Sequence, residues 1–212
     1  MGAVKAYIFD LDGTLLNSMG IWEQIDRAFL KKRGLVSTPD YIRQISSMSF
    51  PEAAKYTIDL FGLKDSPDDL MNEWNEMTVH AYGNTIPLKP GAREYLLKVK
   101  ATGAKIALAT SATRILCNVA LAHHGIAELF DVICFTEEVD FGKSRPDIFL
   151  LATEKLNVRC EDCIVFDDVL AAIMSAKSIG MTTCGVYDES SKSDFEQIAQ
   201  LADAVVYDWN VL

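Results

Sequence analysis

Short apolar runs alternate with longer segments of helical periodicity along most of this 212-residue chain. The runs are rich in β-branched or aromatic residues, a composition typical of buried strands. They cover residues 6–9, 105–109, 132–135, 164–166, 183–186 and 204–207. Helix-length segments separate several of them, at 91–102, 113–125, 146–156 and 171–179. This alternation predicts an α/β fold in which a parallel sheet carries helices on both faces.

One long segment, from about residue 18 to residue 87, contains no convincing strand and has the pattern of several helices. The expected helices cover residues 21–33, 39–48, 51–61 and 69–82. Prolines and glycines stand at plausible helix starts and ends, at Pro39, Pro51 and Pro67 and at Gly34, Gly62 and Gly83. We therefore expect an all-helical domain over residues 17–87, inserted into a core made of residues 1–16 and 88–212.

The charge balance narrows the classes of partner. The net charge is −10 and the sequence pI is about 4.7, and no basic stripe offsets this acidity. Such a surface repels nucleic acid and anionic membrane, so neither is an expected partner, whereas a small phosphate ester is not excluded. From the apolar segment at residues 6–9, which meets two acids at once, we expect no signal peptide, and without a membrane-length apolar stretch we expect no membrane span. Its five cysteines, an odd number, favour reduced thiols and a cytoplasmic location.

Acidic side chains follow two of the expected strands directly. Asp10 and Asp12 come after the first strand, and Gly13 then permits a tight turn. Asp167 and Asp168 end the fourth strand. Because chemistry in open parallel sheets collects at the carboxyl ends of the strands, these acids should lie near one another. Several carboxylates without His or Cys favour Mg²⁺, and a solvated acidic loop is the competing interpretation.

A hydroxyl and a lysine complete the candidate site. Thr110 and Ser111 end the second strand, where a hydroxyl and the backbone N–H groups of the next helix would form an anion cradle. A plain helix N-cap is the alternative for Thr110. Lys143 lies in the loop after the third strand, and by itself it would be an ordinary surface lysine.

Together these residues carry a resemblance to a known family. The run Asp10-Leu11-Asp12-Gly13-Thr14-Leu15, Thr110, the run Lys143-Ser144-Arg145-Pro146-Asp147 and the pair Asp167-Asp168 resemble the four ordered motifs of the haloacid dehalogenase (HAD) superfamily. The resemblance covers essentially the whole chain. It implies a Rossmann-like HAD core with an inserted helical cap, similar to the subgroup of sugar-phosphate phosphatases and β-phosphoglucomutase.

The resemblance also implies a role for each matched residue. Asp10 would attack phosphorus and form an aspartyl-phosphate, and Asp12 would act as acid and then as base. Asp10, Asp168 and the main-chain carbonyl of Asp12 would hold Mg²⁺, with Asp167 as a ligand or its neighbour. Thr110 and Lys143 would stabilise the charge on the transferred oxygens.

Asp12 separates the branches of this superfamily. Members that cleave carbon–halogen or carbon–phosphorus bonds lack an acid two residues after the nucleophile, so this chain resembles an enzyme of phosphate esters. The choice between a phosphatase and a mutase depends on two further positions. Trp22 stands where mutase-like members carry a His, and Phe50 stands near the place of an Arg. Apolar side chains here would not grip a second phosphate, which favours hydrolysis over mutase activity.

The candidate substrate contacts are Gly13, Ser111, Met19, Trp22 and Phe50. The apolar residues among them, together with Met48, have packing within the cap as their competing interpretation. A third possibility, a non-catalytic phosphate-binding scaffold, is disfavoured because the acids are intact.

Overall fold

The computed structural model describes residues 4–45 and 48–212, which divide into two compact units. One unit contains the residues up to Met19 together with Ile86–Leu212, and the other is Gly20–Thr85. The first is called the core unit below and the second the helical unit. Along the chain, the boundaries between the units fall at 19/20 and 85/86. They lie three and two residues inside the predicted boundaries of 16/17 and 87/88.

The two connecting segments explain this shift, because they pair with each other in the core unit. Leu16 forms an antiparallel bridge with Leu88. The backbone N–H of Asn17 donates to the carbonyl of Pro87 at 3.0 Å, and that of Lys89 donates to the carbonyl of Leu15 at 2.8 Å. Residues 15–17 and 87–89 therefore belong to the core by their hydrogen bonds.

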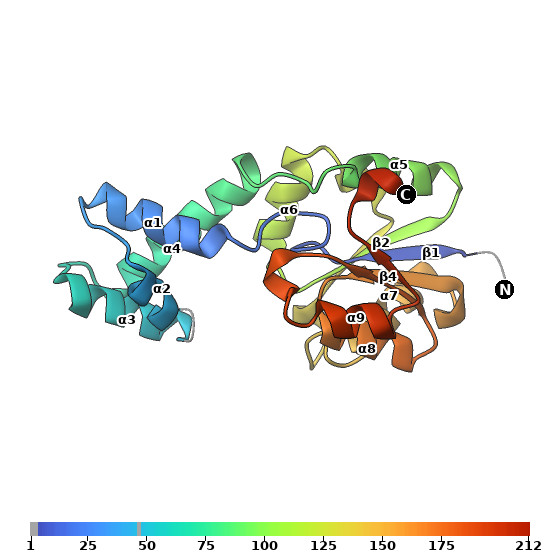
Figure 1. The fold of residues 1–212 in the computed structure, drawn as a ribbon. Coiled ribbons are helices and arrows are strands. Elements are labelled where there is room, and N and C mark those ends of the chain that lie inside the picture. Colours follow the sequence, from blue (N-terminus) through green and yellow to red (C-terminus); the bar gives the residue numbers. More distant parts are fainter. Residues whose placement is uncertain (1–3, 46–47) are drawn as a thin grey trace. The chain divides into compact units, whose positions relative to one another are not determined.

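The described part of the core unit contains a parallel sheet of six strands, in the order β3-β2-β1-β4-β5-β6 (Figure 1). The strands are β1 (Ala6–Phe9), β2 (Lys105–Thr110), β3 (Val132–Phe135), β4 (Cys163–Asp167), β5 (Thr182–Val186) and β6 (Ala204–Val206). Each predicted strand is present within one residue at either end, and the predicted α/β fold is confirmed. Strand β1 pairs with both β2 and β4. Strands β2 and β3 lie on one side of β1, and β4, β5 and β6 lie on the other, so the order of strands switches sides at β1.

Helices cover both faces of this sheet (Figure 1). They are α5 (Ala92–Ala101), α6 (Arg114–His123), α7 (Asp147–Leu156), α8 (Leu170–Ser178) and α9 (Phe195–Leu201). Alternate residues of β1 serve the two faces, as the two-residue period of a strand requires. Ala6 and Ile8 belong to the buried cluster that includes Phe149 of α7 and Ala176 of α8.

The opposite face of the sheet is aromatic. Phe9 and Phe166 stack with ring centroids 4.8 Å apart, and Tyr95 of α5 and Trp209 contact both rings. The indole Nε1 of Trp209 also donates to the carbonyl of Thr14 at 3.2 Å. This packing fixes the chain on both sides of Asp10, since Phe9 precedes it and Thr14 lies in the turn beyond it.

The helical unit consists of α1 (Ile21–Lys32), α2 (Pro39–Ile45), α3 (Phe50–Phe61) and α4 (Pro67–Asn84). Capping boxes begin α3 at Ser49 and α4 at Ser66, and Gly62 ends α3 with a left-handed φ of +62°. Gly83 was expected to end a helix, but it lies inside α4, whose last turn is capped by the N–H of Thr85. The predicted helix over 39–48 reaches residues 46 and 47, which lie outside the described residues.

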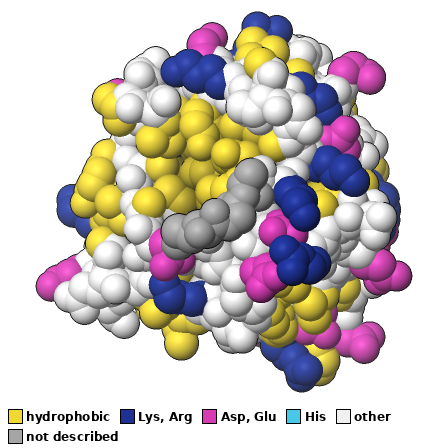
Figure 2. All heavy atoms as spheres, turned by 90° about the vertical axis from the view of Figure 1, so that its right-hand side faces the viewer, with side chains coloured by type: hydrophobic (Ala, Val, Ile, Leu, Met, Phe, Trp, Pro, Cys, Tyr) yellow, Lys and Arg dark blue, Asp and Glu magenta, His cyan; other side chains and the backbone are white. Residues whose placement is uncertain are grey.

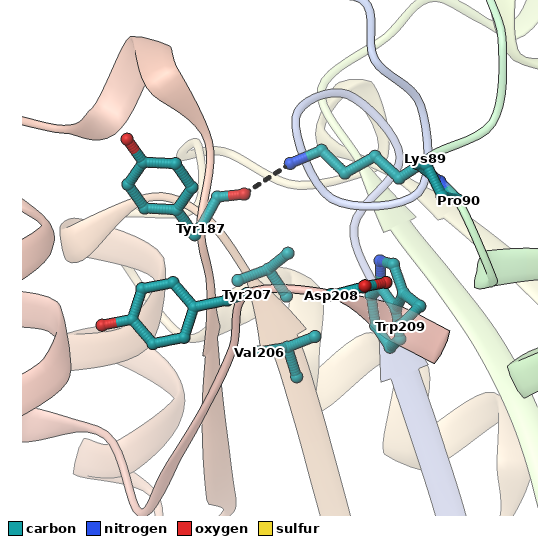
Figure 3. Close-up of a pocket in the computed structure, with 8 residues that line it drawn as sticks. Lys89, Pro90, Tyr187, Val206, Tyr207, Asp208 and Trp209 are labelled. Atoms are coloured by element: carbon teal, nitrogen blue, oxygen red, sulfur yellow. Dashed lines mark hydrogen bonds between the residues drawn. The ribbon is translucent and has the colours of Figure 1, made fainter. Parts of the chain in front are cut away.

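The return from the helical unit is anchored by Lys89. Its Nζ donates to the carbonyl of Tyr187 at 2.7 Å and pairs with Asp188 at 3.0 Å. Figure 3 shows the hollow of about 200 Å³ beside this contact, lined by the ends of β5 and β6 and by Trp209. This largely buried ion pair therefore fixes the chain at Lys89 to the end of β5.

The surface shows no segregation of charge on the face drawn in Figure 2, where acidic and basic side chains are interspersed around a central hydrophobic area. Among the described helices, none combines the length and apolar character that crossing a bilayer requires.

Candidate active site

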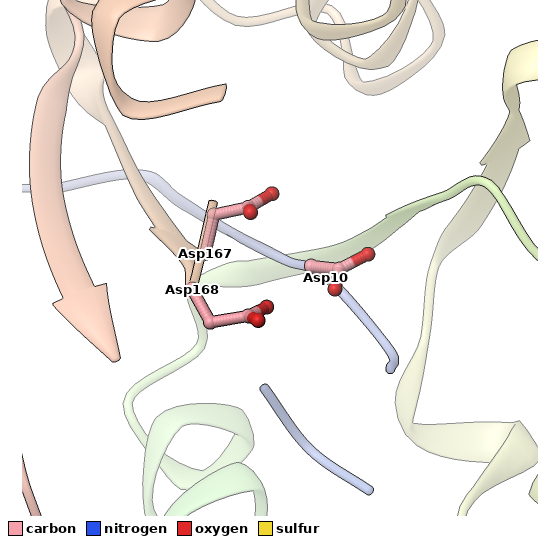
Figure 4. Close-up of side chains that lie close together, drawn as sticks. All are labelled: Asp10, Asp167 and Asp168. Atoms are coloured by element: carbon pink, nitrogen blue, oxygen red, sulfur yellow. The ribbon is translucent and has the colours of Figure 1, made fainter. Parts of the chain in front are cut away.

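Three carboxylates meet at the carboxyl ends of two neighbouring strands. Asp10 follows β1, and its backbone N–H donates to the carbonyl of Phe166 at 2.9 Å, which continues the pairing of β1 with β4. Asp167 is the last residue of β4, and Asp168 follows it. One oxygen from each of the three lies within 4.8 Å of the others, and all three residues are buried (Figure 4).

Lys143 reaches this cluster from the loop after β3. Its Nζ donates to the carboxylate of Asp10 and, at 2.9 Å, to Oδ2 of Asp167. The side chain is buried, and burial alone would lower its pKa, but the charges of Asp10 and Asp167 outweigh that effect and raise the pKa above its usual value. Lys143 is therefore a charged residue of the site and not a surface lysine.

The pKa values of two of these acids are raised. Burial raises the pKa of Asp10 well above its ordinary value, against the lowering effect of Lys143. Burial likewise raises the pKa of Asp168, and the neighbouring charge of Asp167 adds to the effect. Three carboxylates face one lysine, so the fully ionised cluster would carry a charge of −2. A buried, all-oxygen set with this imbalance suits a divalent cation such as Mg²⁺.

The turn after β1 is shaped around Asp168. Gly13 has a left-handed φ of +78°, and a Cβ at this position would overlap the carboxylate of Asp168. The neighbouring hydroxyl of Thr14 donates to Oδ1 of Asp168 at 3.1 Å. Glycine is therefore required here for backbone conformation and for close approach, which is a packing role next to the acid.

Asp12 is held by the loop that follows β1. It is half-buried, and its Oδ1 accepts a hydrogen bond of 2.6 Å from the hydroxyl of Ser18, a buried residue. The bridge between Asp12 and Leu16 brings the two parts of this loop together. A half-buried acid that a hydroxyl holds in position is placed to exchange protons.

Thr110 is the last residue of β2, fully buried, and its Oγ1 accepts a hydrogen bond of 3.0 Å from the N–H of Ala112. The N-cap of α6 is Thr113, whose side chain accepts from the N–H of Leu116. The alternative of Thr110 as a plain N-cap is therefore wrong. Ser111 is exposed in the loop between them.

The predicted substrate contacts outside the catalytic loops fall into both units. Trp22 and Phe50 line one cavity of the helical unit, with ring centroids 5.8 Å apart, and Met48 lines it too. Met19 is exposed and belongs to the core unit.

The sequence patterns missed Thr14 and Ser18. The hydroxyl of Thr14 lies within the first motif, but its partner Asp168 is 154 residues away. Ser18 could have been found as a short polar residue six positions after Asp12, had the turn between them been known.

The fold and this cluster define a class of protein: an α/β enzyme whose carboxylates and lysine meet at the switch point of a parallel sheet. The sequence model of the haloacid dehalogenase-like hydrolases matches residues 7–186. The chain belongs to this family.

Relatives agree with this assignment. The chain is similar to a phosphorylated carbohydrates phosphatase from Thermotoga maritima, with 31% identity over 84% of this chain and 82% of that protein. It is also similar to a validoxylamine A 7'-phosphate phosphatase from Streptomyces hygroscopicus, with 29% identity over 96% of this chain and 93% of that one. The predicted class, a phosphoric monoester hydrolase of this superfamily, is confirmed.

A crystal structure from Thermotoga maritima, provisionally assigned as a β-phosphoglucomutase, superposes with a TM-score of 0.85 and 29% identity. The match covers 98% of this chain and 96% of that one. The resemblance to the phosphatase and phosphoglucomutase-like subgroup is thereby confirmed.

Proposed function

We propose that this protein is a Mg²⁺-dependent phosphatase that hydrolyses a small phosphomonoester through an aspartyl-phosphate on Asp10. The observation that carries the proposal is the buried cluster of Asp10, Asp167 and Asp168 around Lys143. Sugar phosphates are the first candidate substrates, because a relative of 31% identity is named for phosphorylated carbohydrates.

In the proposed reaction, an oxygen of Asp10 attacks phosphorus while the bond from phosphorus to the ester oxygen breaks. Asp12 gives its proton to the departing alkoxide, which leaves as the alcohol. Water then attacks the phosphorus of the aspartyl-phosphate, Asp12 accepts the proton of that water, and Asp10 is released with inorganic phosphate. Thr110 and Lys143 stabilise the charge on the transferred oxygens, which for one well-placed donor is worth about 3–4 kcal/mol.

Asp10, Asp168 and the main-chain carbonyl of Asp12 would hold the Mg²⁺, and Asp167 is a further ligand or supports one from beside the ion. When bound, the ion neutralises the negative charge that the carboxylates and the phosphate bring together. Lys143 alone cannot balance that charge, since two of the three acids would remain uncompensated.

The helical unit is proposed to act as the cap, which selects the leaving group. Met19, Trp22 and Phe50 would contact that group, and Gly13 and Ser111 would lie by the phosphate. We further propose a cytoplasmic location, with no nucleic acid or membrane as partner, on the strength of the net charge of −10.

A mutase that isomerises sugar phosphates is the second candidate, favoured by the superposition on the provisionally assigned β-phosphoglucomutase. The apolar Trp22 and Phe50 count against it, because a mutase must hold a bis-phosphate intermediate by a second phosphate. Conversion of glucose 1-phosphate to glucose 6-phosphate, stimulated by a sugar bis-phosphate, would favour the mutase over the phosphatase.

The test of the leading proposal is release of phosphate from an aryl phosphate, with and without Mg²⁺, by the full chain and by Asp10→Asn. We expect Mg²⁺-dependent turnover that falls at least about 10³-fold in the variant, as expected when a nucleophile is removed. Asp59→Asn, an exposed acid of α3, is the matched control and should keep full activity. Turnover that survives in Asp10→Asn would contradict the mechanism.

A further inference from the structure

The helical unit contains a cavity of about 400 Å³, whose wall includes Trp22 and Phe50, the proposed contacts of the leaving group. All four helices of the unit line it, through Trp22 and Asp26 of α1, Ile42 of α2, Phe50 of α3 and Trp74 of α4. Its volume lies within the range of small-molecule sites, about 300–1,000 Å³. The cavity is therefore large enough for a ligand of roughly ten heavy atoms.

Three aromatic rings form much of the wall. The centroids of Trp22 and Phe50 are 5.8 Å apart in an edge-to-face arrangement, and those of Phe50 and Trp74 are 5.5 Å apart. Trp22 is 48% exposed, so a large ring stands open to solvent instead of packing inside the unit. Open aromatic faces attract cations, ammonium groups in particular.

The same cavity contains a carboxyl group that lacks a cationic partner. Asp26 is only 8% exposed, and it accepts a hydrogen bond from the hydroxyl of Tyr41 at 3.4 Å. Within residues 4–45 and 48–212, no Lys, Arg or His pairs with Asp26, whereas the nearby Glu23 is paired with Arg27. A buried carboxylate is costly unless a cation or several donors compensate it.

Trp74 adds a buried donor to the wall of this cavity. It is buried against the cavity, and its Nε1 is a donor without a hydrogen-bond partner among the described residues. Most indole N–H groups find a partner when they are buried. Among the described residues, Asp26 thus lacks a cationic partner and the indole N–H of Trp74 lacks an acceptor.

We propose that this cavity binds a small organic cation, with the cationic group beside Asp26 and an apolar body against Trp22, Phe50 and Trp74. The carboxylate provides the opposite charge, and the rings provide both the apolar contact and the attraction of their faces for the cation. The inference rests on the proposed role of the helical unit as the cap, because Trp22 and Phe50 serve both, but binding here requires no turnover at Asp10 and can be measured separately from it.

The test measures binding of benzyltrimethylammonium to the full chain by titration calorimetry, in parallel with its neutral carbon isostere neopentylbenzene. The two ligands share size and shape, so a difference in affinity reports the charge. We expect the cation to bind at least about tenfold more tightly. Equal affinity for both ligands, or binding of neither, would overturn the proposal.

Two variants locate the site. Asp26→Asn keeps the shape of the side chain and should abolish the preference for the cation, whereas the exposed Asp59→Asn removes the same charge from the same unit and should leave it intact. Trp22→Ala should weaken binding of both ligands, and it is the safer variant for folding because Trp22 is half exposed. An unchanged preference in Asp26→Asn would refute the assignment.

The pH dependence gives an independent readout. Burial raises the pKa of Asp26 to about 7, although the hydrogen bond from Tyr41 opposes the shift and the charge of Glu23 adds to it. The other helices present to this region the hydroxyl of Thr57 from α3 and the Trp74 ring from α4. Because the ligand pairs with the ionised acid, its affinity should rise about tenfold from pH 6 to pH 8 in the parent chain, and not in Asp26→Asn.

Discussion

The two ends of strand β4 carry buried aspartates in opposite electrostatic situations. At the amino end, Asp162 accepts hydrogen bonds from Arg159 at 3.0 Å and from Lys5 at 3.1 Å, and these bonds hold its pKa below the ordinary value. At the carboxyl end, burial raises the pKa of Asp168, and the nearby charge of Asp167 raises it further. One residue type therefore meets two environments at the two ends of one strand.

The difference distinguishes an acid with a structural role from an acid with a chemical role. Asp162 receives its compensating charges from side chains of the chain itself, so its place is stable without a ligand. Asp168 shares a site in which Lys143 is the one cation for three acids among the described residues, so a positive charge is still to be supplied. An acid that remains uncompensated in the fold is a better functional candidate than an acid that is merely buried.

The lysines at the two ends provide the sharpest test of this comparison. Lys143→Met should lower kcat by about 10²–10³-fold, because the variant loses the donor to Asp10 and Asp167 and its charge at the transferred oxygens. Lys5→Met, which removes a partner of Asp162, should change kcat by less than about twofold. Steady-state phosphate release measures kcat for both variants. Equal losses of kcat would contradict the proposed difference between the two ends of β4.

A smaller effect is expected from Asp168→Asn, which keeps the size of the side chain and removes a ligand charge. The variant should need at least about 100-fold more Mg²⁺ for half-maximal activity, since even outer groups of metal sites cost 10–100-fold. A Mg²⁺ titration of activity and of isothermal binding measures this. An unaltered Mg²⁺ requirement would remove Asp168 from the ligand set.

Ser18→Ala should lower kcat by about tenfold with KM changed less than twofold, because the hydroxyl positions Asp12 and is not proposed to contact substrate. Ser18→Thr keeps the hydroxyl and should restore most of the rate. Loss of substrate affinity with kcat intact would assign Ser18 to binding instead of positioning.

Asp162→Asn should leave kcat within about twofold of the parent and lower the stability. Because the folded pKa of Asp162 lies below the ordinary value of about 3.9, the ionised acid stabilises the fold above that pH. The stability difference between parent and variant should then be full at pH 7 and shrink as the pH falls through the lowered pKa. Urea unfolding at pH 7 and near pH 3.5 measures it, and a difference independent of pH would contradict the assignment.

Much of the fold was predictable because its strands are buried and bounded by polar residues. β1 and β3 match the predicted ranges Ala6–Phe9 and Val132–Phe135. Helix α9 was not predicted, since only Phe195 and Ile198 are buried in its seven residues and so short a segment shows no clear period. The end of α4 was misplaced because a glycine inside a helix resembles a helix end.

The site was partly predictable for a related reason. Parallel strands bring their ends to one edge, so Asp10, Asp167 and Asp168 could be grouped before any distance was known. The contacts of Lys143 and Ser18 depend on how two loops turn, which no periodicity encodes. The position of Asp26 was also beyond prediction, because an acid at helical spacing is usually a solvated residue.

The bridge between Leu16 and Leu88 has a consequence for the ancestry of such chains. It holds the two ends of the helical insertion at adjacent points, so the geometry of the sheet does not depend on which segment is inserted between them. Closing a loop between ends already paired costs little entropy, and that cost grows slowly with length. Recombination could therefore exchange the inserted helices, or trim them to a tight turn, without disturbing the register of β1 and β4.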